Sequence, residues 1–122
     1  MRSYKSLFAW RRASEFCLAT LEAVDDAWKP NAAALFEQLR RAAVSADVNI
    51  VEGYALQTVG LFRKHLRIAV GSAAEAERLL EIAESRGYLS SEVSASLKAK
   101  ADLALSALFG LLRSPRLRGP TR

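Results

Sequence analysis

Two short polar segments supply the residue types that could do chemistry. Asn49 and Glu52 are three residues apart, and so are Ser72 and Glu75 further along the chain. Residues three apart share one face of a helix, so the two pairs can meet across two packed helices. Two facing carboxylates, Glu52 and Glu75, would suit a metal ion or a general acid/base pair.

The other ligands that a metal site in a helical bundle needs are missing. Di-iron bundles take a Glu-x-x-His motif from each of two helices. This chain has one histidine, His65, with Phe62 three residues before it. Burying a polar group without a partner costs roughly 2 to 7 kcal/mol, so we favour a hydrogen-bonded network between helices. The predicted network comprises Arg40, Arg41, Ser45, Asn49, Glu52, Ser72 and Glu75.

No group of residues predicts catalysis. Ser45, Ser72, Cys17 and His65 are the available nucleophiles and bases, but residue type alone is weak support for a catalytic triad. We expect Cys17 to be a small core hydrophobe and His65 to lie partly exposed among basic neighbours. The sequence has no glycine-rich phosphate loop, dinucleotide fingerprint or paired-cysteine zinc spacing. We therefore predict no enzyme activity, no catalytic residue, no cofactor and no metal.

The charge balance favours anionic partners. Eighteen Lys and Arg outweigh thirteen Asp and Glu, which gives a net charge of +5. Phosphate binding needs little beyond a density of basic side chains, so RNA or DNA is a candidate partner. The predicted contacts are Arg63, Lys64, Arg67 and Arg113. Alternatively, these clusters are solvated faces, and the acidic residues between Glu75 and Glu84 meet a basic protein.

Size and composition predict one domain, 1–122, in the cytoplasm. The single cysteine excludes an internal disulfide. No apolar run reaches the roughly 18 to 20 residues of a membrane helix, and the first residues lack a signal-peptide core. We expect no membrane contact.

Apolar residues recur at steps of three and four, which predicts an all-α fold. The expected helices span about 7–28, 32–53, 58–86 and 91–113, followed by a basic tail, 114–122. Serine, threonine and asparagine commonly occupy the N-cap position of a helix, whereas proline and glycine commonly end a helix. The predicted N-caps are Ser6, Asn31, Thr58 and Ser90.

The fourth predicted helix is apolar around nearly its whole circumference. A single bundle covers only the inward stripe of such a helix, so the remainder should face a partner. A second copy of the chain is the simplest partner, and we predict a homo-oligomer. The residues concerned are Leu103, Ala104, Leu105, Ala107, Leu108, Phe109, Leu111 and Leu112.

Several blocks resemble the bacterial four-helix-bundle family encoded in intervening sequences of 23S ribosomal RNA genes. The resemblance implies an antiparallel up-down-up-down bundle, closed rings of five subunits and no established catalytic activity. A distant relative is the accessory protein of diversity-generating retroelements, which associates with a reverse transcriptase and nucleic acid. The blocks are Tyr4–Leu7 with Trp10, 39–45, 49–53, Phe62, 68–72, 74–77 and Gly87–Leu89.

Two departures from the family pattern affect what the resemblance implies. Asp47 stands where the family commonly has proline, so a kink in the second helix is not expected to carry over. Leu56 and Leu61 replace an arginine and a glutamate around the start of the third helix, which weakens an RNA-binding role for that turn.

The combined hypothesis is a non-enzymatic, homo-oligomeric, pentameric helical scaffold or adaptor that binds nucleic acid, RNA in particular. The first alternative is a protein-interaction module without nucleic acid. The second is a metal or small-molecule site built on Glu52 and Glu75.

Overall fold

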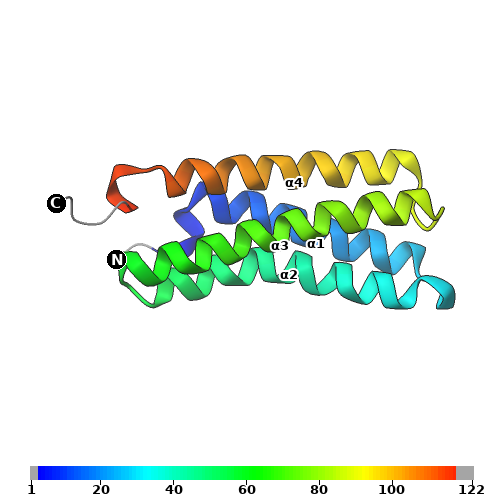
Figure 1. Ribbon diagram of the computed structural model, residues 1–122, viewed down its shortest axis with the longest axis horizontal. Coiled ribbons are helices and arrows are strands. Elements are labelled where there is room, and N and C mark those ends of the chain that lie inside the picture. Colours follow the sequence, from blue (N-terminus) through cyan, green and yellow to red (C-terminus); the bar gives the residue numbers. More distant parts are fainter. Residues whose placement is uncertain (1–2, 118–122) are drawn as a thin grey trace.

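A computed structural model describes residues 3–117, and within that range every regular element is a helix. Four long helices alternate in direction, and each packs on two neighbours: α1 and α3 both contact α2 and α4 (Figure 1). The long helices are α1 (Phe8–Ala27), α2 (Ala33–Ala55), α3 (Val59–Ser85) and α4 (Ser91–Leu112). The one-turn 3-10 helices are η1 (Tyr4–Ser6), η2 (Pro30–Ala32) and η3 (Pro115–Leu117). The predicted all-α, up-down-up-down four-helix bundle is confirmed; residues 118–122 of the predicted tail lie outside the described range.

The second half of the chain begins and ends its helices with the predicted residues. Thr58 Oγ1 accepts a hydrogen bond from the Leu61 amide at 3.2 Å, and Ser90 Oγ accepts one from the Val93 amide at 3.1 Å. Both caps satisfy amides that the first helical turn leaves free. Gly87 has a φ of +75°, the left-handed conformation expected after a helix end.

The N-caps predicted for α1 and α2 are wrong. Ser6 lies inside η1, and α1 follows Leu7 with no side-chain cap. Asn31 lies inside η2, which begins at Pro30 because the fixed φ of proline suits the first position of a helical turn. The second helix also runs past the predicted end at residue 53 to Ala55, and the chain turns at Gln57, whose φ is +60°.

The core forms two clusters along the bundle. Phe16, Phe36 and Leu80 belong to the cluster near the α1–α2 turn. Ile50, Leu66 and Leu108 belong to the cluster near the opposite end. All six side chains are fully buried, and burying each one stabilises the fold by roughly 1.5 to 3 kcal/mol before entropic costs.

Helix α4 keeps part of its apolar surface in solvent. Leu97, Ala101, Ala104 and Leu108 point into the core, as the helical repeat requires. Leu103, however, is 51% exposed and Phe109 is 46% exposed. A single bundle thus leaves two sides of α4 uncovered, the feature from which the sequence predicted self-association.

Candidate functional site

A line of hydrogen bonds joins α2 to α3. Ser45 and Ser72 share a hydrogen bond of 2.7 Å between their hydroxyls. The amide nitrogen of Asn49 donates to Ser45 Oγ at 2.9 Å and to the Ser45 carbonyl at 3.1 Å. The amide oxygen of Asn49 lies 2.9 Å from His65 Nδ1, which must carry the proton because a carbonyl oxygen only accepts. We call Ser45, Asn49, His65 and Ser72 the polar chain.

A glycine allows α2 and α3 to approach closely beside the polar chain. A Cβ atom added at Gly53 would lie 2.7 Å from the Cβ of His65 and 3.2 Å from Phe62 Cδ1. Real Cβ atoms do not approach this closely, so a side chain at 53 would push the helices apart. Gly53 therefore sets the spacing at which Asn49 can reach His65.

The polar chain differs from the predicted network in its charged members. Arg40 pairs on the opposite side of α2 with Asp25 of α1 and with Glu37, and its guanidinium lies 4.8 Å from the centre of the Trp28 ring. Arg41 and Glu52 are exposed, and neither bonds to any residue within 3–117. Arg41 lies four residues before Ser45 and Glu52 three residues after Asn49, so both follow the same stripe of α2 as the polar chain, at its solvent-exposed rim. Proximity on one helix face therefore did not bring these charged groups into the polar chain.

The two carboxylates considered for a metal site are far apart. Glu75 Oε2 accepts a hydrogen bond of 3.0 Å from Gln38 Nε2. Gln38 precedes Glu52 by fourteen residues on α2, which is roughly 21 Å of helix rise. Within the described residues, no three His, Cys, Asp or Glu side chains gather as metal ligands would. The arrangement does not support a site at Glu52 and Glu75.

Sequence reasoning missed His65 and Gln38 as contacts between α2 and α3. The available signal was the antiparallel register, in which each step forward along α2 is matched by a step back along α3. Once Ser45 is set opposite Ser72, Asn49 falls near His65 and Gln38 near Glu75. His65 is partly exposed, as predicted, but it also contacts Asn49 across α2 and α3, which its basic neighbours in the sequence did not indicate.

The predicted phosphate contacts divide into two groups. Arg63 donates from Nη1 to the carbonyls of Leu112 at 2.8 Å and Leu117 at 2.9 Å, so it satisfies the end of α4 and holds η3 beside it. Lys64, Arg67 and Arg113 are exposed, and they form no hydrogen bond or ion pair with the residues that the structure describes. Those three remain free to meet an anion.

Basic side chains gather at one end of the bundle. This end holds both ends of the described chain and the turn between α2 and α3 (Figure 1). Acidic residues are few there and dominate the other end, which makes the first a surface of positive potential. The cations of this basic end are Lys5, Arg11, Arg12, Arg63, Lys64, Arg67, Arg113 and Arg116.

A contact between α1 and α2 explains two of the sequence's unusual residues. Trp10 Nε1 donates to Asp47 Oδ1 at 2.8 Å, so Asp47 binds α2 to α1. Cys17 is 5% exposed; burial, assisted by the charge of Asp47, raises the pKa of its thiol to about 11. Cys17 is the small core hydrophobe that was expected, and a thiol in this state is a poor nucleophile.

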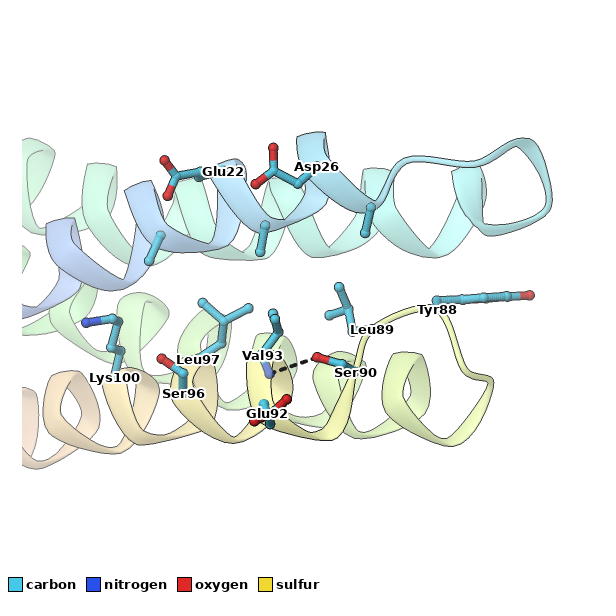
Figure 2. A pocket seen from close by; sticks show the side chains of 13 residues that line it. Glu22, Asp26, Tyr88, Leu89, Ser90, Glu92, Val93, Ser96, Leu97 and Lys100 are labelled. Atoms are coloured by element: carbon cyan, nitrogen blue, oxygen red, sulfur yellow. Dashed lines mark hydrogen bonds between the residues drawn. The ribbon is translucent and has the colours of Figure 1, made fainter.

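A groove between α1 and α4 lies toward the end opposite the basic one. Leu89, Val93 and Leu97 point across it toward α1, whereas the carboxylates of Glu22 and Asp26 point away from α4 (Figure 2). Small-molecule sites combine an apolar wall with a few polar groups that converge on the ligand. This groove has the apolar wall without the convergent polar groups.

The fold and these contacts define a small antiparallel four-helix bundle held in register by half-buried polar contacts. Residues 5–110 match the family described as 23S rRNA-intervening sequence protein, and the chain belongs to that family. A solved structure from the S23 ribosomal protein family of Bacteroides thetaiotaomicron, described as a protein with unknown function, superposes with a TM-score of 0.76. Its sequence is 21% identical, and the match covers 87% of this chain and 99% of that one. No protein with a curated description matches the chain.

None of the helices within residues 3–117 is long and apolar enough to cross a membrane.

Proposed function

We propose that this chain is a non-enzymatic, cytoplasmic scaffold that assembles with copies of itself and binds nucleic acid through its basic end. The observation that carries the proposal is the set of unpaired cations there, Lys64 and Arg67 on α3 with Arg113 directly after α4. Unpaired, exposed cations can release counterions from a phosphate backbone without first breaking an ion pair. RNA is the favoured nucleic acid.

Self-association is supported by the apolar side chains left in solvent. Leu18, Val44 and Val48 are 63%, 38% and 42% exposed on the side of α1 and α2, while Phe109 is 46% exposed on the side of α3 and α4. Exposed apolar groups that cluster in this way commonly mark contact sites. Assembly would repeat the basic end, so weak contacts to one strand would add up. The number five rests on the family resemblance alone.

The absence of enzyme activity is part of the proposal, and two observations support it. The thiol of Cys17 is buried and protonated, and the nitrogen of His65 that faces Asn49 is engaged in the polar chain. The α1–α4 groove offers apolar side chains without a facing acid/base pair.

Salt-dependent binding tests the nucleic-acid role. A labelled structured RNA and a labelled duplex DNA would be titrated with the native protein across salt concentrations. Binding should weaken steadily with salt, and replacing Lys64 and Arg67 with alanine should lower the affinity and reduce the salt slope by about two. The matched control is Lys29→Ala with Arg86→Ala, which removes equal charge from the opposite end. Equal losses of affinity in the two double variants would mean that binding depends on net charge alone, which would contradict the assignment of the binding surface to the basic end.

A protein-interaction module without nucleic acid is the second candidate. The α1–α4 groove favours it, because an apolar wall some three turns long suits an amphipathic helix. No binding to either nucleic acid at low salt would replace the first candidate with this one.

A further inference from the structure

The outer edges of α2 and α4 carry matching charges of opposite sign. On α2, Arg41 and Glu52 are eleven residues apart. Asp102 of α4 and Arg113, the residue that caps the C-terminal end of α4 in a helical conformation, are also eleven residues apart. Eleven residues make three turns of a helix, so the members of each pair lie on the same side, roughly 16 Å apart. All four residues are exposed. Along the chain, α2 carries a positive and then a negative charge, whereas α4 carries a negative and then a positive one. When two such helices lie side by side in the same direction, each charge therefore faces one of opposite sign.

The fold provides that direction and nearly the same height. Helices α2 and α4 lie at diagonal corners of the bundle and run parallel, because one helix separates them in the up-down order. Ser45 lies opposite Ser72 of α3, and Arg63 and Glu77 of α3 contact Leu112 and Asp102 of α4. Counting along the helices from these contacts places Arg41 level with Asp102, and Glu52 level with Arg113, to within about one turn.

Apolar side chains fill the space between the charges on both edges. Val44 and Val48 lie between Arg41 and Glu52, in the same hollow as Leu21 of α1. Phe109 lies between Asp102 and Arg113, at the height of Val48. Because the two patches differ and lie on opposite sides of the bundle, a contact between them joins unlike surfaces. Repeating such a contact gives a ring where the rotation closes and an open filament where it does not.

We propose that the α2 edge of one copy packs on the α4 edge of the next, with Arg41 beside Asp102, Glu52 beside Arg113, and Val48 against Phe109. This inference rests on the self-association proposed above and names its interface. It assigns Arg113 to the contact between copies and leaves Lys64 for phosphate, while Arg67 lies at the border of the contact, in the same hollow as Phe109 and Arg113.

The contact between Glu77 of α3 and Asp102 of α4 is consistent with this pairing. A hydrogen bond with Asp102 is the largest factor that raises the pKa of Glu77, to about 7, followed by burial and the charges of Asp102 and Glu81. Lys98 opposes this rise only in part. Two neighbouring carboxylates share a proton when no cation is close enough to let both ionise. The guanidinium of Arg41 from the next copy would supply that cation.

Charge reversal and its rescue test the interface. Native mass measurement would compare the wild-type chain with Arg41→Glu, Asp102→Arg and the combined variant. Each single variant sets like charges opposite each other, which should weaken assembly by about tenfold or more, and the combined variant should restore it. Lys64→Glu is the control, since it makes the same charge change on α3 away from both edges, and its mass should match wild type. Far-ultraviolet circular dichroism would verify that each exposed substitution leaves the bundle folded.

The outcomes separate the interface from the proposed function. A wild-type monomer at micromolar concentration would overturn both. A wild-type oligomer whose mass survives the single reversals, or is not restored in the combined variant, would overturn the interface alone.

Disulfide trapping distinguishes unlike from like surfaces. Val48→Cys with Phe109→Cys should give covalent oligomers under mild oxidation, whereas Val48→Cys alone should stay uncrosslinked. Crosslinked dimers of Val48→Cys alone would mean that α2 edges meet each other, which contradicts the proposal.

Discussion

The half-buried and the solvent-exposed polar residues of α2 differ in where they find partners. In the half-buried set, Ser45 and Asn49 find all their partners within the chain, and Gly53 brings those partners into reach. In the exposed set, Arg41 and Glu52 have no partner among the described residues. The first set therefore fixes the register of the bundle, and the second is free to act on another molecule. Substitutions in the half-buried set should change stability, and substitutions in the exposed set should change only association.

The largest effect is expected from Gly53→Ala. Its new Cβ would lie 2.7 Å from the Cβ of His65, so α2 and α3 must separate, and overpacking of this kind costs roughly 1 to 3 kcal/mol. Urea denaturation would measure the loss. The matched control is Gly71→Ala on α3, where a Cβ meets nothing within 4 Å and the better helix former should stabilise by about 0.5 to 1 kcal/mol. Equal effects at both glycines would contradict the role given to Gly53.

A smaller loss is expected from Asn49→Leu, which removes the centre of the polar chain. Ser45 and His65 would each lose a partner in a half-buried position, so the free energy of unfolding should fall by about 1 to 2 kcal/mol. Arg41→Leu in the exposed set should change it by less than about 0.5 kcal/mol. Nucleic-acid affinity of the folded Asn49→Leu protein should match wild type. A fully stable Asn49→Leu variant that lost binding would show that the polar chain is a binding site.

The smallest effect concerns Glu77 of α3, which contacts Asp102 of α4. In the single chain its pKa is raised from 4.5 to about 7, so the folded single chain holds the proton more tightly than the unfolded chain does. The stability from this group is complete below about pH 4.5 and is lost as the pH rises through 7. Unfolding by urea at pH 5, 6, 7 and 8 should give a decline that Glu77→Gln reduces. An unchanged decline in Glu77→Gln would assign it to other groups.

The fold could be predicted from the sequence because the signals that define its helices lie between residues close together in the chain. Apolar spacing of three and four, with Thr58 and Ser90 directly before two helices, was sufficient to predict α3 and α4. Ser6 and Asn31 misled because each lies within a 3-10 turn, whose formation depends on how the chain enters the bundle.

The site was less predictable because its contacts span helices. His65 was judged by Lys64 and Leu66, although adjacent residues on a helix point in directions about 100° apart. Arg63 satisfies carbonyls 49 and 54 residues away, a pairing that no local spacing encodes. By residue type alone, Arg63 was grouped with the neighbouring cations as a phosphate contact. Only the packing of α3 against α4 shows that Arg63 is bonded within the chain.

Both ends of the described chain, and the turn between α2 and α3, lie at one end of the bundle (Figure 1). In a ring whose rotation axis runs along the helices, every copy would present that end on the same rim. The two faces of such an assembly differ. One is basic and carries Lys64 and Arg67 of each subunit, and the other is richer in carboxylates. A nucleic acid would therefore bind one face of the ring only, and the opposite face would remain accessible to a different partner.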